Sequence, residues 1–208
     1  MGHPIAEGLD SYVKKDDNTK IITLVPGSRM SEVKKLLPVF QETADMLIRC
    51  GYKDYKFVIP TVETTDEYSR KNIQKWKNKP DLIPAKMRYE VFANTYIAVV
   101  ASGTVSAELA IMHIPTIVVY KMNPLTCLLA HILLRVKWVS LVNILMGKTI
   151  FPELLGKKAN WQAIIDALQQ LTLPSYRNKM IDELKQADDQ WTKSGKKAAK
   201  LIADDILS

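Results

Sequence analysis

The stretch "LVPGSR" (24–29) contains the residue types that bind a phosphate. An apolar run ends there at a proline and Gly27, and the hydroxyl of Ser28 and the guanidinium of Arg29 follow directly. Glycine lets a ligand approach the backbone closely, and a guanidinium matches the geometry of phosphate oxygens. A tight strand-to-helix turn with an exposed arginine is the alternative interpretation.

A second stretch of the same kind is "VVASGTVSAELA" (99–110). An apolar run ends there, and a helical pattern begins at Ser102, Gly103 and Thr104. Free N–H groups at a helix start and the helix dipole favour an anion, and the two hydroxyls add donors. An ordinary N-cap arrangement is the alternative. Neither GxxxxGK[ST] nor GxGxxG occurs, which excludes the P-loop and the dinucleotide fingerprint.

Glu108 lies four residues after Thr104, on the same face of the predicted helix. Next to a bound phosphate, its carboxylate could accept hydrogen bonds from ribose hydroxyls, as acidic residues do in dinucleotide sites. A solvated helix residue is the alternative for Glu108 taken alone. Together with the two turns, Glu108 predicts a site for a nucleoside diphosphate.

Alternating strands and helices must position these residues. Apolar, β-branched runs predict strands at 20–26, 55–60, 81–86, 96–102 and 114–120. Helical spacing predicts helices at 31–49, 66–78, 88–95 and 104–113. Pro38 is expected to kink the first helix. This order predicts an α/β fold, a Rossmann-like doubly wound parallel sheet whose ligands bind beyond the carboxyl ends of the strands.

Beyond residue 121 the alternation loosens. We expect an apolar helix at 124–134, a strand-like "KWVSLV" (137–142), a loop through Gly147 and Pro152, and helices at 160–171, 175–190 and 192–207. The predicted domain organisation is a linker at 1–19, a donor-nucleotide-binding α/β domain at 20–172, and C-terminal helices at 173–208.

Composition narrows the class of partner. A net charge of +7 and a pI of about 9.3 favour anionic partners. The two cysteines and three scattered histidines form no disulfide framework and no zinc-ligand pattern, so a zinc site is not expected. The 11-residue apolar stretch at 124–134 is too short to span a membrane. Lysines and arginines are spread along the chain and mixed with acidic residues, as in 66–78, which argues against a non-catalytic basic module that binds membrane or nucleic acid.

Five stretches, in order, resemble the lipid A disaccharide synthase family: "GHPIAE" (2–7), "LVPGSRMSEV" (24–33), "ASGTVSAELA" (101–110), "PTIVVYKMNPLT" (115–126) and "VSLVNILMGKTIFPELL" (139–155). The resemblance covers nearly the whole chain except its tail. It corresponds to the C-terminal half of the family, and therefore implies the C-terminal nucleotide-binding domain of a B-type glycosyltransferase. Another UDP-sugar enzyme of the same fold is the alternative.

The resemblance implies a reaction in which UDP-2,3-diacylglucosamine glycosylates 2,3-diacylglucosamine 1-phosphate and UDP is released. No cofactor and no nucleic-acid partner are implied. An N-terminal domain or half-protein would supply the acceptor groove and the catalytic base, so these 208 residues alone are expected to be inactive. The implied location is cytoplasmic, at the inner face of the inner membrane. The segment 124–138 is a candidate membrane contact, with a buried helix or a subunit contact as the alternative.

The resemblance also implies roles for single residues. Gly27, Ser28 and Arg29 form the family's Gly-Ser-Arg turn, with the arginine offsetting charge on the leaving UDP. Ser102, Gly103 and Thr104 match its diphosphate-binding helix start, and Glu108 its ribose-binding acid.

Two further polar residues match the family, in a segment that also departs from it. Asn143 and Glu153 match the polar residues of its Ser-Leu-Pro-Asn and Pro-Glu-Leu-Leu sequences, and a turn residue is the alternative for Asn143. Val142 replaces the proline, and Gly156 stands where glutamine is frequent.

Overall fold

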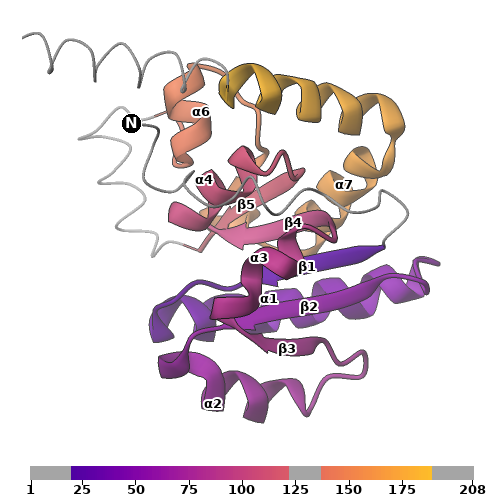
Figure 1. The fold of residues 1–208 in the computed structure, drawn as a ribbon. Helices are drawn as coiled ribbons and strands as arrows, with labels where there is room; N and C mark the ends of the chain where they lie inside the picture. Colours follow the sequence, from indigo (N-terminus) through magenta and orange to yellow (C-terminus); the bar gives the residue numbers. More distant parts are fainter. Residues whose placement is uncertain (1–19, 122–136, 189–208) are drawn as a thin grey trace, which may run out of the picture.

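A computed structural model describes residues 20–121 and 137–188 of the chain (Figure 1). Within these residues, six strands form one sheet in the order β3-β2-β1-β4-β5-β6, and every neighbouring pair is parallel. The strands are β1 (Ile21–Val25), β2 (Lys56–Thr61), β3 (Asp81–Pro84), β4 (Thr95–Ala101), β5 (Thr116–Tyr120) and β6 (Glu153–Leu155). The order reverses direction at β1, which confirms the predicted doubly wound parallel sheet.

Helices connect the strands and cover the sheet on both sides (Figure 1). They are α1 (Met30–Arg49), α2 (Glu63–Ile73), α3 (Arg88–Phe92), α4 (Thr104–Ile111), α6 (Leu141–Met146) and α7 (Trp161–Thr172), with short 3₁₀ turns η2 (Ala85–Met87) and η3 (Gly156–Lys158). Residues 174–188 form one more helix. α1 packs against α2 and α7, whereas α4 packs against α6.

The core lies between the sheet and these helices. Central strand residues such as Leu24, Ile97 and Val118 are fully buried, as expected for a parallel sheet covered on both faces. Leu184, from the helix at 174–188, belongs to the same core. Arg177 of that helix is buried, donates to the carbonyl of Tyr96 at the start of β4, and lies over its ring. The helix after α7 therefore packs on the body of the sheet.

Pro38 lies inside α1, which continues through it from Met30 to Arg49. Proline cannot donate the helical hydrogen bond to the carbonyl of Lys34. Pro38 and Lys34 are both exposed, so water can hydrate that carbonyl. The opposite face of α1 buries Leu37 and Phe40, among others, and packing on that face holds the helix against the sheet.

The structure corrects the predicted elements in three places. The prediction of a strand at "KWVSLV" is wrong, because α6 begins at Leu141. Ser140 is the N-cap residue of this helix, and its hydroxyl accepts from the N–H of Asn143 at 3.3 Å. The predicted loop around Pro152 contains β6, a three-residue strand that is too short to show a periodic pattern. α2 covers Glu63–Ile73 rather than 66–78.

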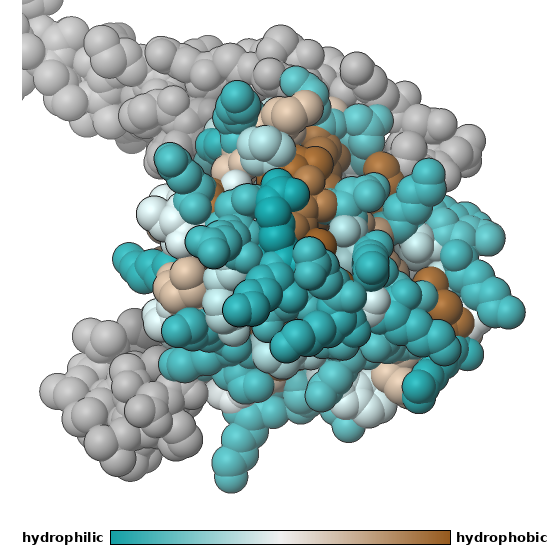
Figure 2. Space-filling model, turned by 90° about the horizontal axis from the view of Figure 1, so that it is seen from below, coloured by the Kyte–Doolittle hydropathy of each residue, from teal (hydrophilic) through white to brown (hydrophobic). Residues whose placement is uncertain are grey.

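Several predictions concern segments outside the described residues: the linker at 1–19, the apolar helix at 124–134 and the tail helix at 192–207. Among the helices of the two described ranges, none is long and apolar enough to cross a membrane. Figure 2 views the molecule from below Figure 1, and the described residues on that face are mostly hydrophilic, with hydrophobic side chains in a few places.

Candidate functional site

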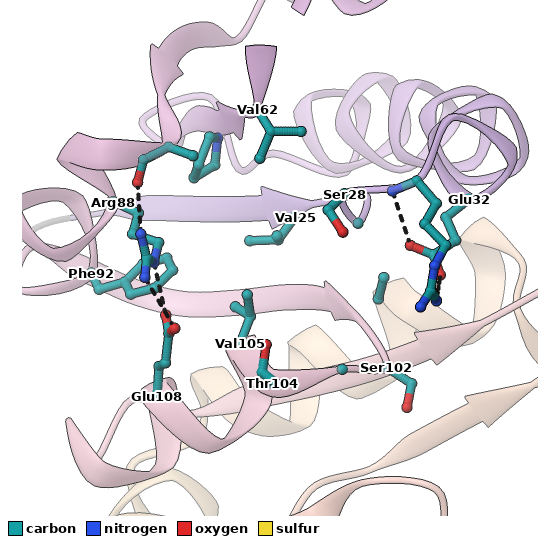
Figure 3. A pocket seen from close by; sticks show the side chains of 16 residues that line it. Val25, Ser28, Glu32, Val62, Arg88, Phe92, Ser102, Thr104, Val105 and Glu108 are labelled. Carbon is teal, nitrogen blue, oxygen red and sulfur yellow. Dashed lines mark hydrogen bonds and ion pairs between the residues drawn. The ribbon is translucent and has the colours of Figure 1, made fainter. Parts of the chain in front are cut away.

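A cavity of about 400 Å³ lies at the carboxyl edge of the sheet (Figure 3). β1 and β4 are neighbours, with Val25 opposite Val100, so the turns that follow these strands meet at this edge. The cavity brings together seven of the predicted site residues, namely Gly27, Ser28, Arg29, Ser102, Gly103, Thr104 and Glu108. Residues from the end of β2, from η2 and from α3 complete its lining.

Arg29 stands at the rim of the cavity, immediately before α1, and its side chain is 81% exposed. Its Nη1 donates to Oε1 of Glu32 at 3.1 Å, and its backbone N–H donates to Oε2 of the same carboxylate at 3.4 Å. One carboxylate therefore orients both the backbone and the guanidinium of Arg29. The remaining guanidinium donors face solvent, where a ligand could accept from them.

Gly27 makes room for that carboxylate. Its φ is +102°, a value that residues other than glycine rarely adopt. A Cβ at this position would lie 2.3 Å from Oε2 of Glu32. The glycine predicted as a point of close ligand approach is thus also required by the turn itself and by the Glu32–Arg29 pair.

The start of α4 is not capped by a side chain from the described part of the chain. Gly103 is the N-cap residue, in an extended conformation, and a Cβ there would meet no atom within 4 Å. The hydroxyl of Ser102 donates to the carbonyl of Val139 at 3.3 Å instead of capping the helix. An ordinary N-cap arrangement therefore does not account for this turn. The first N–H groups of α4 have no side-chain cap among the described residues and can donate to a bound anion.

Glu108 is buried and forms a forked ion pair with Arg88. Nε of Arg88 donates to Oε2 at 2.9 Å and Nη2 donates to Oε1 at 3.1 Å. The hydrogen bond with Glu108 raises the pKa of Arg88 above its usual value. The interpretation of Glu108 as a solvated helix residue is wrong, because only 9% of its side chain is exposed.

Arg88 is a cavity residue that the sequence interpretation missed. It is the first residue of α3 and follows β3 through η2, so it reaches the cavity from the same carboxyl edge as the two turns. Its position just after a strand, at a helix start, is the signal that could have indicated it. Its Nη1 donates to the carbonyl of Ala85 at 3.1 Å, and its Nη2 also donates to the hydroxyl of Tyr89 at 2.6 Å.

Asn143 and Glu153 do not line the cavity. Instead they bond to each other and to the backbone around them. Glu153 accepts from the N–H groups of Val139 and Ser140 at 2.8 and 2.9 Å. The carbonyl of Val139 accepts a hydrogen bond from the hydroxyl of Ser102, a cavity residue. A single hydrogen bond therefore connects this network to the lining of the cavity.

No group of three or more His, Cys, Asp or Glu residues that could hold a metal ion occurs in residues 20–121 and 137–188. The charged groups of the cavity are the two pairs Arg29–Glu32 and Arg88–Glu108. In Figure 3, Glu32 lies at one end of the cavity and the Arg88–Glu108 pair at the other, with Thr104 and Val105 between them. The arrangement offers exposed guanidinium donors at one end and carboxylate acceptors at the other.

Comparison with known proteins identifies the relatives of the chain. The model of the family described as Lipid-A-disaccharide synthetase matches residues 1–206. A lipid-A-disaccharide synthase of Rhodospirillum centenum is 34% identical over 193 residues, covering 88% of this chain and 48% of that protein. The enzyme of that name from Persephonella marina is 32% identical and covers 100% of this chain and 59% of its own length. The chain spans about half the length of the curated relatives it matches.

Solved structures share the fold. An α,α-trehalose-phosphate synthase (UDP-forming) of Burkholderia vietnamiensis is similar over 91% of this chain and 46% of its own, with a TM-score of 0.56 and 15% identity. The ADP-heptose heptosyltransferase II of Escherichia coli is similar over 84% of this chain and 53% of its own, with a TM-score of 0.53 and 11% identity. At these identities the likeness shows the fold alone.

Proposed function

The chain belongs to the lipid-A-disaccharide synthetase family, and from this premise we propose that its cavity binds the UDP portion of a UDP-sugar donor. The donor is UDP-2,3-diacylglucosamine, the acceptor is 2,3-diacylglucosamine 1-phosphate, and UDP is the leaving group. The observation that carries the proposal is that both strand-end turns and Glu108 line one cavity.

The diphosphate is assigned to the end of the cavity formed by the two turns. The start of α4 supplies N–H groups and the positive end of a helix dipole, and Ser28 and Thr104 add hydroxyl donors. Arg29 at the rim places a guanidinium where negative charge grows as the bond from sugar to phosphate breaks. A charge placed there stabilises the departing UDP more than the bound donor.

The ribose is assigned to Glu108. A carboxylate has about four lone-pair positions, and Arg88 occupies one on each oxygen. The hydroxyl of Tyr89 also hydrogen-bonds to this carboxylate. One ribose hydroxyl can therefore take the acceptor position that remains, and the vicinal hydroxyl can bind by replacing that of Tyr89. The guanidinium also offsets the charge of Glu108, which would otherwise repel a phosphate one helical turn away.

Asn143 and Glu153 were expected to contact UDP. We propose instead that they position the backbone next to the cavity. Glu153 fixes the backbone at Val139, whose carbonyl accepts the hydroxyl of Ser102. A direct contact with the ligand would require the carboxylate to give up two backbone donors and the amide of Asn143.

The acceptor site and the general base are proposed to belong to a separate N-terminal domain. The acylated substrates favour a location in the cytoplasm, at the inner face of the inner membrane. The segment 124–138, a candidate membrane contact, lies almost wholly outside the described residues. No nucleic acid is expected as a partner.

Titration calorimetry with UDP tests the proposal on the 208-residue chain as it stands. We expect weak UDP binding, and a loss of about 1–3 kcal/mol for Glu108→Ala, because hydrogen bonds to a charged acceptor disappear. Glu42→Ala, an exposed glutamate in α1, is the matched control and should bind as wild type does. Equal affinity for Glu108→Ala and wild type would remove Glu108 from the site, and tighter binding to an unrelated RNA than to UDP would favour the basic-module alternative.

A further inference from the structure

We propose that Arg88 is a positioning residue that gives the cavity a preference for ribonucleotides over 2′-deoxyribonucleotides. This inference rests on the proposed function, because it takes the ligand to be a nucleoside diphosphate. Arg88 would act through Glu108, which it holds, rather than by touching the ligand.

Arg88 is itself held in place by contacts other than Glu108. Its Nη1 donates to the carbonyl of Ala85, its Nη2 donates to the hydroxyl of Tyr89, and its guanidinium lies 4.2 Å from the centre of the Tyr89 ring. These contacts come from η2 and α3, whereas Glu108 projects from α4. The arginine is therefore a fixed point on one side of the cavity that holds a carboxylate from the other side, as Figure 3 shows.

The fork between the two side chains fixes the plane of the carboxylate. Two parallel N–H···O bonds leave the carboxylate no freedom to rotate, so its other acceptor positions, one of which the Tyr89 hydroxyl uses, point in set directions. Only 9% of the Glu108 side chain and 29% of the Arg88 side chain are exposed, so little water can reach the pair. A hydroxyl pair with matching spacing would satisfy both oxygens at once.

Ribose offers two vicinal hydroxyls, and 2′-deoxyribose offers one. With the deoxy ligand, the fixed and nearly buried carboxylate would receive one hydrogen bond fewer from the ligand. A site built to hydrogen-bond a hydroxyl rejects the analogue that lacks it, because the site's own polar group is then unpaired. If Arg88 is removed, the carboxylate can turn towards water or towards the single remaining hydroxyl, and the preference falls.

The test compares the dissociation constants of UDP and 2′-deoxy-UDP, measured by titration calorimetry on the 208-residue chain. We expect wild type to prefer UDP by roughly tenfold or more. Arg88→Met should lower this ratio to below about threefold, and Arg88→Lys should lie between the two, because an ammonium cannot form the fork. Arg70→Met is the matched control, since it removes an arginine–carboxylate pair with Asp66 that does not line the cavity, and its ratio should equal that of wild type.

The outcomes separate this inference from the proposed function. If wild type prefers UDP and Arg88→Met keeps the same ratio, the positioning role of Arg88 is wrong and the proposed function stands. Failure of wild type to bind either nucleotide overturns both. Thermal unfolding verifies that each variant is folded. If Arg88→Met does not fold, the UDP to 2′-deoxy-UDP ratios of Arg88→Lys and Tyr89→Phe test the role of Arg88 instead. Each of these variants weakens the contacts that hold Glu108 while keeping most of the packing.

Discussion

The side-chain amide of Asn143 donates to Oε1 of Glu153 at 2.8 Å, joining α6 to the start of β6. The same amide also donates to the carbonyl of Phe151 at 2.8 Å, and its oxygen accepts from the N–H groups of Ile150 and Phe151 at 2.8 and 2.9 Å. A fully buried asparagine thus satisfies backbone groups that have no access to water.

Asn143→Ala should destabilise the protein by roughly 2–4 kcal/mol, because it leaves buried backbone and carboxylate groups without partners. Denaturation with urea measures this loss. Asn72→Ala is the matched control, because the side chain of Asn72 makes a single hydrogen bond within the described part of the chain, to the carbonyl of Tyr68, and Asn72 is only partly buried. A variant of Asn143 that keeps its stability but no longer binds UDP would show that Asn143 contacts the ligand.

Gly27→Ala tests how Gly27 and Glu32 position Arg29. Gly27 and Gly51 have nearly the same φ, +102° and +100°. A Cβ at Gly51 meets nothing within 4 Å, whereas at Gly27 it collides with Oε2 of Glu32. Both alanine variants should lose about 1 kcal/mol of stability from backbone strain.

Only Gly27→Ala should also displace Glu32 and release Arg29, and therefore weaken UDP binding. Unfolding and calorimetry on the two variants separate strain from displacement. Equal UDP affinity in the two variants would mean that the Glu32–Arg29 pair does not shape the site.

Asp66 predicts a pH dependence of stability. Hydrogen bonds from Arg70 and from the hydroxyl of Thr61, both at 2.6 Å, hold the pKa of Asp66 below its usual value. A carboxyl whose pKa is lowered by folding stabilises the protein at pH values above its unfolded pKa of about 3.9. That stabilisation is lost as the pH falls below this value and through the folded pKa.

The free energy of unfolding of Asp66→Asn should therefore differ from that of wild type at pH 7, and the difference should shrink as the pH falls below the unfolded pKa of about 3.9 and through the lowered folded pKa. Glu67→Gln, an exposed position on the same helix, is the control. A difference that stays constant over this range would show that the pair with Arg70 does not account for the effect of Asp66.

The two strand-end turns could be predicted from the sequence because each combines a long apolar run with a glycine and a helical pattern. Thr104 and Glu108 share a helix face, so their common place in the cavity follows from spacing alone. The strand order then brings the two turns together, since β1 and β4 are neighbours in a doubly wound sheet.

Arg88 could not be paired with Glu108 in the same way. The two residues are 20 positions apart, and their meeting depends on where β3 and α3 end relative to α4. Asn143 and Glu153 show the opposite difficulty, because their residue types suggest ligand contacts while their neighbours in space are backbone groups. The three residues of β6 are too few for any periodicity to appear.

Arg29 can be tested in a protein that also includes the proposed N-terminal domain. Its side chain is largely exposed at the rim of the cavity and is oriented by Glu32, so it can meet a diphosphate without first being uncovered. Arg29→Ala should lower kcat more than it raises KM, because the guanidinium matters most when charge develops on the departing UDP.

Arg29→Lys should restore little of this loss, because an ammonium cannot form the bidentate contact with phosphate oxygens. Arg49→Ala, at the far end of α1, is the control and should leave both constants unchanged. Steady-state rates with varied donor concentration distinguish the possibilities. A change confined to KM would mean that Arg29 binds the diphosphate in the ground state only. Full rescue by lysine would mean that the reaction requires the charge of the side chain and not the geometry of the guanidinium.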